Sequence, residues 1–241
     1  MKQFSNKTIG EIVAQNIEYA RVFNSFGIDF CCGGNIFIED AAKNASVPLD
    51  KIIEALNNQT SYGGLPLALN FDNWSLELLI DYIVKYHHHY IRNNGPRIYN
   101  LLDKVVKAHG ETDKHLPEVL NLFRASLMDL DNHLAKEENI LFPLVYEIVT
   151  AYERGDSLPQ FHCGSVQNPI RVMLQEHEDE GARFKRISEL TNYYTAPKHA
   201  CNSYKLVLEE LRLFEENLHI HIHVENNILF KKSIIIEDSL S

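Results

Sequence analysis

The apolar residues between Trp74 and the C-terminus repeat with the period of an α-helix. Four long stretches place them at positions i, i+3 and i+4, the spacing that gives a helix one apolar face. The connections between the stretches are fairly short, which favours neighbouring helices that run antiparallel. The sequence therefore predicts an all-α protein built around an antiparallel four-helix bundle. The predicted helices span residues 74–108, 117–153, 169–190 and 201–232.

Prolines mark two places where these helices should deviate from a straight course. Gly95 and Pro96 lie inside the first stretch. A proline within a helix removes a backbone hydrogen bond and clashes with the preceding turn, so we expect a kink or a break there. Pro143 lies inside the second stretch and predicts a bend in that helix.

The N-terminal part of the chain predicts a smaller helical domain. Thr8 and Glu11 have the spacing of a capping box at the start of a helix. Gly27 is placed to end the next helical segment. Ser46 and Pro48 should open a further helix, as an N-cap and an early proline.

The composition changes between these two parts of the chain. Residues 57–73 are rich in Asn, Gly and Pro, which indicates a linker. We therefore expect a small helical domain at 1–60, a linker at 61–73 and the bundle at 74–241. So small a domain buries little apolar surface and should lean on the bundle or on a second chain. In the second case the protein would form a homodimer through its N-terminal domains.

One phrase occurs twice in the bundle. The first copy reads HLAKEENILF from His133, and the second reads HIHVENNILF from His221. Each copy places a glutamate four residues after the histidine, at Glu137 and at Glu225, so that imidazole and carboxylate share one helix face. A further histidine precedes each copy, by 46 residues in one case and by 44 in the other. The candidate set is His87, His133, Glu137, His177, His221 and Glu225.

The apolar stripes indicate which side chains should face the core. On each of the four helices one candidate histidine falls on the stripe. Other histidines fall among charged residues, and we expect His88, His219 and His223 to face solvent. The glutamates that fall outside the stripes on the same grounds are Glu138, Glu176 and Glu178.

Four imidazoles and two carboxylates on buried stripes need a partner. A buried carboxylate costs several kcal/mol or shifts its pKa to stay neutral, and a pair of metal ions would remove that cost. Imidazole with carboxylate suits iron, manganese or zinc, whereas the absence of inward thiolates argues against copper(I) and iron–sulfur clusters. The alternative is a core in which the histidines only form hydrogen bonds with the glutamates.

Charge and hydropathy narrow the class of protein. The 241 residues carry a formal net charge of −10, and phosphate binding needs a clustered basic face, so we expect no nucleic-acid partner. The chain opens without a leader pattern and contains no apolar segment near the roughly 20 residues that cross a membrane. We therefore expect a cytoplasmic protein with reduced cysteines.

The cysteines leave several alternatives open. Cys31 and Cys32 are adjacent in the phrase IDFCCGG, where a glycine turn exposes backbone amides that can lower a thiol pKa and make the pair reactive. The alternative is a turn that only packs the small domain. His162 and Cys163 lie in a long loop, where they are either an extra metal contact or incidental. Cys201, near a helix start, is expected to be structural.

The set His87, His133-x-x-x-Glu137, His177 and His221-x-x-x-Glu225 resembles the hemerythrin-like (HHE) cation-binding domain. The opening domain, with its DFCCGG turn, looks like the small domain that precedes such bundles in the Repair of Iron Centers family. Together the two resemblances cover nearly the whole chain. They imply a non-haem di-iron stress-response protein that restores iron–sulfur clusters damaged by nitric oxide or peroxide.

The same resemblance implies roles for the candidate residues. Glu137 and Glu225 would bridge two iron ions, together with an oxo or hydroxo bridge, and the four histidines would be terminal ligands. Oxygen-carrying hemerythrins have five histidine ligands and this chain matches four, which disfavours simple oxygen carriage. Three functions stay open: repair of damaged iron–sulfur proteins by iron donation or nitric oxide removal, reduction of nitric oxide to nitrous oxide, and sensing of oxygen or iron.

Overall fold

The computed structural model describes residues 4–58 and 70–240. These residues form α-helices, one short 3₁₀ helix and three π-helical turns, with a single isolated β-bridge between Thr8 and Phe37. The predicted all-α fold class is thus confirmed. Of the predicted linker at 61–73, residues 61–69 lie outside the described residues, and Phe71–Asn73 form the 3₁₀ helix η1. The domain boundaries at 60 and 74 stay a prediction.

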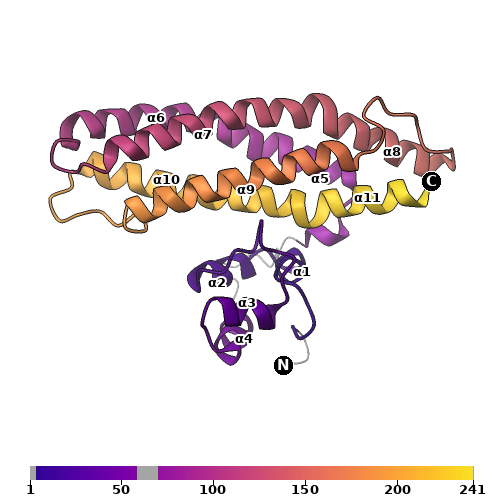
Figure 1. Ribbon diagram of the computed structural model, residues 1–241, viewed down its shortest axis with the longest axis horizontal. Coiled ribbons are helices and arrows are strands. Elements are labelled where there is room, and N and C mark those ends of the chain that lie inside the picture. The colour runs from indigo at the N-terminus through magenta and orange to yellow at the C-terminus, as the bar shows by residue number, and fades with distance from the viewer. Residues whose placement is uncertain (1–3, 59–69, 241) are drawn as a thin grey trace. The chain divides into compact units, whose positions relative to one another are not determined.

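Short helices make up the N-terminal part of the chain (Figure 1). They are α1 (Ile9–Gln15), α2 (Tyr19–Ser25), α3 (Ile38–Asn44) and α4 (Leu49–Asn57). The predicted capping box precedes α1: the Thr8 amide donates to Glu11 Oε2 at 2.8 Å, and the Glu11 amide donates to Thr8 Oγ1 at 3.3 Å. Gly27 follows α2 with a φ of 68°, a conformation that glycine adopts without steric cost. Ser46 does not cap α4 as predicted; its φ of 56° places it in the turn after α3, and Pro48 is the N-cap.

The backbone groups into two compact units, of which the first combines Met1–Ile80, Val145–Gln160 and His219–Ser241. In this unit α1 contacts the π turn η4 (Glu225–Leu229), which is followed by α11 (Phe230–Ser239). Gly10 and Gly34 pack directly against Asn227 of η4. A Cβ atom would lie 2.5 Å from Asn227 Oδ1 at the first glycine and 2.6 Å at the second. A side chain at either position would therefore separate the N-terminal segment from the helix.

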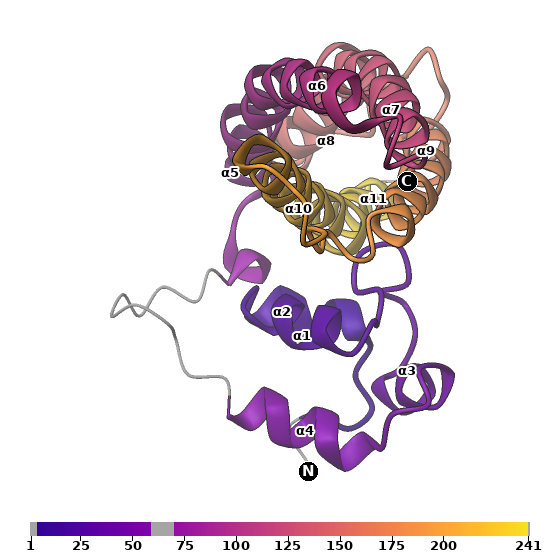
Figure 2. The same cartoon turned by 90° about the vertical axis from the view of Figure 1, so that its left-hand side faces the viewer.

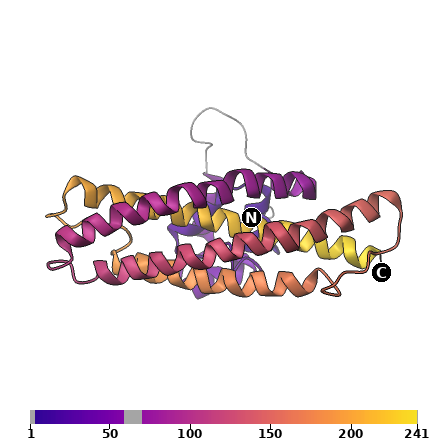
Figure 3. The same cartoon turned by 90° about the horizontal axis from the view of Figure 1, so that it is seen from above.

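The second unit, Asp81–Leu144 with Phe161–Leu218, contains the core of the four-helix bundle. Its helices are α6 (His89–His109), α7 (Leu116–Lys136), α9 (Gln167–Leu190) and the first part of α10 (Asn202–Val224). Helix α7 contacts both α6 and α9, and the view along the axis shows these helices around a common interior (Figure 2). Seen from above, successive helices run in opposite directions (Figure 3). The predicted antiparallel bundle is therefore confirmed.

Aromatic side chains fill part of the interior of this second unit. The rings of Phe184 and Phe214 stack with centroids 5.7 Å apart, and Phe123 meets Phe214 edge-on at 5.3 Å. All three side chains are buried. Across the described ranges of the chain, no helix combines the length and the apolar content needed to span a bilayer.

The helices are interrupted by π turns, and the break expected at Gly95 and Pro96 does not occur. The bend expected at Pro143 stays a prediction. Helix α6 runs through Pro96 without a break. The first interruption is η2 (Ile83–His88), which lies between α5 (Leu76–Tyr82) and α6. The second is η3 (Glu137–Leu141), which lies between α7 and α8 (Phe142–Arg154). The third is η4, which lies between α10 and α11. A π turn closes hydrogen bonds from i to i+5 and so holds one residue more than an α-helical turn. The apolar stripe that includes Ile83 therefore continues at His88 five residues on, as well as at His87.

Candidate metal centre

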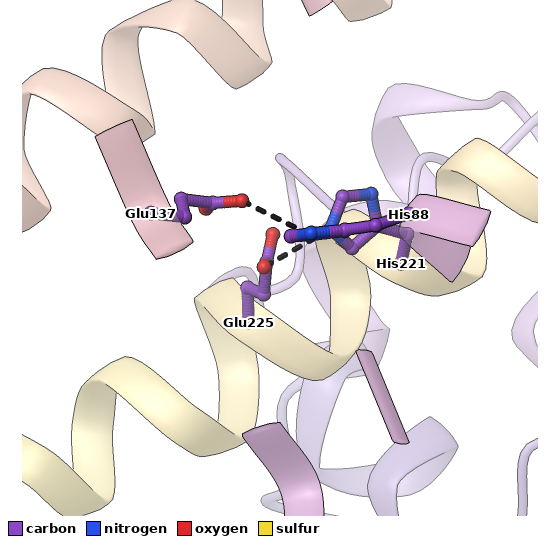
Figure 4. Close-up of side chains that lie close together, drawn as sticks. All are labelled: His88, Glu137, His221 and Glu225. Atoms are coloured by element: carbon purple, nitrogen blue, oxygen red, sulfur yellow. Dashed lines mark ion pairs between the residues drawn. The ribbon is translucent and has the colours of Figure 1, made fainter. Parts of the chain in front are cut away.

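Six buried side chains form two groups of potential metal ligands. In each group the ligand atoms all lie within 4.8 Å of one another. The first group is His88, Glu137, His221 and Glu225, and the second is His133, Glu137, His177 and Glu225. Figure 4 shows the rings and carboxylates of the first group pointing toward one another. Both glutamates belong to both groups, which is the arrangement that two bridging carboxylates would have.

The π turns position three of these side chains. Glu137 is the first residue of η3, Glu225 is the first residue of η4, and His88 is the last residue of η2. Turns of this kind are rare and often occur at functional sites. The π turns therefore occur at the same positions in the chain as three of the potential metal ligands.

Glu137 faces a different histidine with each of its oxygens. His88 Nε2 lies 3.3 Å from Oε2, and His133 Nε2 lies 3.4 Å from Oε1. On the other motif, His221 Nε2 lies 3.0 Å from Glu225 Oε1. Neighbouring ligand atoms around an ion with bonds of about 2.1 Å are roughly 3.0–3.4 Å apart. The donor atoms thus have the spacing of a coordination shell.

Two imidazoles of the second group meet nitrogen to nitrogen. His133 Nε2 and His177 Nε2 are 3.1 Å apart, and both side chains are buried. The Nδ1–H of His133 donates to Glu176, which leaves Nε2 as the nitrogen directed at His177 and Glu137. Nitrogen and carboxylate donors together suit first-row metals such as iron, manganese and zinc. The chemistry of the donor set therefore fits a pair of such ions.

Acidic residues from neighbouring helical segments fix the orientation of two of the histidines. His133 Nδ1 donates to Glu176 Oε2 at 2.8 Å, and His88 Nδ1 donates to Glu138 Oε1 at 2.7 Å. Each carboxylate is in turn held by a cation, Glu138 by Arg92 at 2.6 and 3.1 Å and Glu176 by Lys136. A carboxylate that accepts from the far nitrogen of a histidine selects the tautomer whose other nitrogen can bind a metal.

These two outer carboxylates are held in the ionised form. Burial raises the pKa of Glu138, but hydrogen bonds from Arg92 and His88 outweigh it, and the pKa lies below its ordinary value. Burial likewise raises the pKa of Glu176, and hydrogen bonds from Lys136 and His133 bring it below its ordinary value. Both groups therefore carry the negative charge that holds an imidazole N–H.

The structure places His88, and not His87, in the first donor group. The sequence assigned His88 to a solvated face, and that assignment is wrong because the side chain is fully buried. His87 is also buried, but its Nδ1 lies 3.1 Å from Asn217 Oδ1 and it belongs to neither donor group. The cause is the extra residue of η2, which an α-helical period does not include.

The other five candidates do meet in the donor groups. They are His133, Glu137, His177, His221 and Glu225. Their role as metal ligands stays a prediction. Glu138 and Glu176, which the sequence placed outside the apolar stripes, support the site from outside.

Two further histidines of the last helical run do not face solvent as predicted. His223 is fully buried and its ring lies 5.7 Å from that of Phe30. Burial lowers the pKa of His223 to about 4, so the ring is neutral. His219 is partly buried and meets the same phenylalanine edge-on at 6.2 Å. The helix face that was predicted to be exposed to solvent is thus covered by the N-terminal segment of the same compact unit.

The cysteine turn has a different electrostatic character from the predicted one. Its amides are occupied by Asp29: Oδ1 accepts from Cys31 N at 2.9 Å and from Cys32 N at 3.0 Å, and Oδ2 accepts from Gly33 N at 2.9 Å. The Cys31 thiol donates to Asp29 Oδ1 at 3.2 Å. A hydrogen bond with Cys32, burial and the charge of Asp29 raise the pKa of Cys31. The expected lowering of the thiol pKa by the turn is therefore wrong for Cys31.

The cysteine turn nevertheless forms a small group of its own. Asp29, Cys31 and Cys32 have ligand atoms within 4.8 Å of one another, and the two sulfur atoms are 3.9 Å apart. The other sequence candidate, the loop of His162 and Cys163, contributes to none of the donor groups found among the described residues. Cys163 donates instead to the carbonyl of Ser165 at 3.6 Å.

Comparison with known proteins finds a family match for each of the two parts of the chain. Residues 79–233 match the hemerythrin HHE cation binding domain, and residues 5–60 match the ScdA_N domain, a domain of unknown function. The bundle and its donor groups thus define a protein of the hemerythrin HHE class. Within it, the chain belongs to the family of iron–sulfur cluster repair proteins that includes ScdA and YtfE.

The relatives match along almost their whole length. The chain is 30% identical over 224 residues to the iron–sulfur cluster repair protein ScdA of Staphylococcus haemolyticus, covering 93% of this chain and 96% of that one. It is 30% identical to a probable iron–sulfur cluster repair protein of Haemophilus influenzae, covering 95% and 97%. It is 28% identical to YtfE of Pectobacterium atrosepticum, covering 96% and 98%.

Proposed function

We propose that this protein repairs iron–sulfur clusters damaged by nitrosative or oxidative stress in cytoplasmic client proteins. Relatives that match over nearly the whole chain are named iron–sulfur cluster repair proteins. The single structural observation behind the proposal is that Glu137 and Glu225 each belong to both donor groups. A pair of carboxylates shared in this way supports two neighbouring ions.

The proposed cofactor is a pair of iron ions with an oxo or hydroxo bridge. His88 and His221 would hold one ion, His133 and His177 the other, and Glu137 and Glu225 would bridge them. When bound, the iron pair would supply exchangeable iron and an open position for nitric oxide. The donors are imidazoles and carboxylates and not thiolates, which supports release of iron to a client.

The protein side chains contribute orientation and charge. Glu138 and Glu176 each hold one imidazole by its Nδ1–H, so that Nε2 faces the centre. The carboxylates of Glu137 and Glu225 are buried, and they would offset part of the charge of the two ions while the ions offset the cost of burying them. This burial would limit the access of bulk water to the ions.

Metal analysis of the purified protein tests the cofactor. We expect about two irons per chain in the native sequence, and a loss of both together with the visible charge-transfer absorption in Glu137→Ala/Glu225→Ala. Glu147→Ala/Glu178→Ala, which changes two exposed glutamates, is the matched control and should keep the iron. Zinc in place of iron, or retention of iron in the first double variant, would overturn the proposal.

Repair itself is measured with a cluster-dependent dehydratase that nitric oxide has inactivated. The iron-loaded protein should restore its activity, and Glu137→Ala/Glu225→Ala should not. Nitrous oxide is measured in the same anaerobic mixtures with an electron donor. Sustained formation of nitrous oxide without restored dehydratase activity would identify a nitric oxide reductase instead.

The cysteines and the oligomeric state belong to the same proposal. If Cys31 and Cys32 take part in repair, Cys31→Ala/Cys32→Ala should impair reactivation while the bundle keeps its iron. Unchanged reactivation would assign the turn a packing role only. A homodimer stays a prediction, which size-exclusion chromatography with light scattering tests directly.

A further inference from the structure

A further set of potential metal donors lies at the end of one bundle helix and in the loops beside it. His109 is the last residue of α6, and its Nε2 lies 3.3 Å from the Sγ atom of Cys201, which directly precedes α10. Beside this pair, His199 Nε2 donates to Asp113 Oδ2 at 2.9 Å. The rings of His109 and His199 are 6.5 Å apart. None of the four residues belongs to the candidate metal centre.

We propose that His109, His199 and Cys201 bind one divalent cation of the Zn²⁺ type, with Asp113 as the carboxylate that orients His199. A thiolate and two imidazoles are the donors that zinc takes most readily in proteins. The cluster does not depend on the proposed repair function, since its residues and the bundle donors are different.

The contact between His109 and Cys201 already has the spacing of two zinc ligands. Zinc–sulfur bonds of about 2.3 Å and zinc–nitrogen bonds of about 2.0–2.1 Å, set at a tetrahedral angle, place the two ligand atoms about 3.5 Å apart. The observed 3.3 Å between Nε2 and Sγ is close to that value. A cation would take the place of the hydrogen bond between the thiol and the imidazole.

His199 would supply the third ligand through its other ring nitrogen. Asp113 accepts from Nε2 and leaves Nδ1 available, the arrangement by which a carboxylate orients a zinc-bound histidine. Two imidazoles on one tetrahedral ion have ring centroids roughly 5 Å apart, so the His199 ring must approach by about 1.5 Å from its present 6.5 Å. The side chain is 51% exposed, in the loop that precedes α10, which leaves it room to turn.

Such an ion would join two separate connections of the bundle. His109 ends α6 and Asp113 lies in the connection between α6 and α7, whereas His199 and Cys201 lie in the connection between α9 and α10. Because the ion would bind the folded chain and not the unfolded one, it would raise the free energy of unfolding with its concentration. The cluster is therefore a metal cross-link at one end of the helices.

Cobalt(II) added to the iron-loaded protein is a direct probe, since a bound thiolate gives it a near-ultraviolet charge-transfer band. We expect the band to saturate at one Co²⁺ per chain and to vanish in Cys201→Ser. His199→Gln should weaken the binding at least tenfold. Cys163→Ser and His115→Gln, which change a cysteine and a histidine outside the cluster, should leave the band unchanged.

A measurement on the unaltered protein guards against a folding defect in the variants. Saturating Zn²⁺ should slow the alkylation of Cys201 by iodoacetamide at least tenfold, followed by mass spectrometry of its peptide, and should leave Cys163 unaffected. A cobalt band that persists in Cys201→Ser, or equal alkylation with and without Zn²⁺, would overturn the proposal. The band should also persist in Glu137→Ala/Glu225→Ala, which separates this cluster from the bundle centre.

Discussion

Asn227 donates a hydrogen bond from its side-chain amide to the backbone carbonyl of Cys31, at 3.0 Å. Asn227 lies two residues after Glu225 in the same π turn. Nearby, His223 Nδ1 lies 3.3 Å from the carbonyl oxygen of Phe30. The cysteine turn is thus fastened to the helical turn that begins with a proposed bridging ligand. A change in the backbone at Glu225 could therefore reach the cysteine turn through Asn227 and its hydrogen bond to Cys31.

Replacing Asn227 should loosen this attachment. Asn227→Ala removes a buried hydrogen bond, and we expect a loss of about 1–2 kcal/mol in the free energy of unfolding. We also expect a faster reaction of Cys31 with a thiol reagent, because its turn loses an anchor. Asn121→Ala, at an exposed position of α7, is the control. Equal reactivity of Cys31 in both variants would show that the turn is held by other contacts.

The two adjacent histidines of η2 should behave differently toward metal. His88→Ala should lose at least one of the two expected irons, since the residue belongs to the first donor group. His87→Ala should keep the iron and instead lose about 1–3 kcal/mol of stability, because a buried contact with Asn217 is removed. Iron analysis and thermal unfolding of both variants distinguish them. The opposite result would restore the assignment made from the helical period.

Glu176 should tune metal affinity without touching the ions. Glu176→Gln keeps the size of the side chain but removes the charge that holds His133, and loss of such an outer carboxylate typically weakens metal binding 10–100-fold. Glu178→Gln, an exposed neighbour on the same helix, should leave affinity unchanged. Titration against a competing chelator measures both. Equal affinities would mean that Glu176 serves only its ion pair with Lys136.

Glu215 predicts a pH dependence of stability that is separate from the metal centre. Burial raises its pKa to about 7, with the Tyr194 hydroxyl partly opposing the shift. The folded protein therefore binds this proton more tightly than the unfolded chain. Stability from this group is full below about pH 4 and is lost as the pH rises toward 7.

The variant Glu215→Gln removes this titration. At pH 8 we expect it to exceed the native protein by about 2 kcal/mol in the free energy of unfolding, and the difference should shrink toward zero near pH 4. Denaturant unfolding at several pH values checks this, with Glu147→Gln as the exposed control. A difference that does not change with pH would exclude the titration of Glu215 as its cause.

Much of the fold follows from the spacing of apolar residues, because burial of a stripe is what holds each helix in the bundle. The stripe through Leu130 and Leu134 also carries His133 and Glu137 inward, and all four are buried. The capping box at Thr8 is a local interaction, and a local pattern was enough to predict it. The α-helical period gave the wrong orientation for His88. The π turn there contains one residue more than an α-helical turn, and a prediction based on the α-helical period does not include that residue.

Contacts between residues of different helices could not be predicted, because an apolar stripe only indicates which face of its own helix is buried. Glu138 lies off the apolar stripe, yet it meets His88, 50 residues away in the chain. Glu176 meets His133 from another helix in the same way. The electrostatics of the cysteine turn had a local signal, since an aspartate two residues before Cys31 is placed to accept from the following amides.

The three π turns are positions at which deleting a single residue should disrupt the metal site. Each holds one residue beyond the α-helical repeat, so deleting a single residue there would restore a regular α-helix and rotate one side against the other by about 100°. Ligands and apolar stripe on that helix would then no longer face inward together. A one-codon deletion within Ile83–His88, Glu137–Leu141 or Glu225–Leu229 would thus cost the site more than the loss of a single side chain. The rotational register of each helix and the placement of its metal ligands are therefore linked at these three turns.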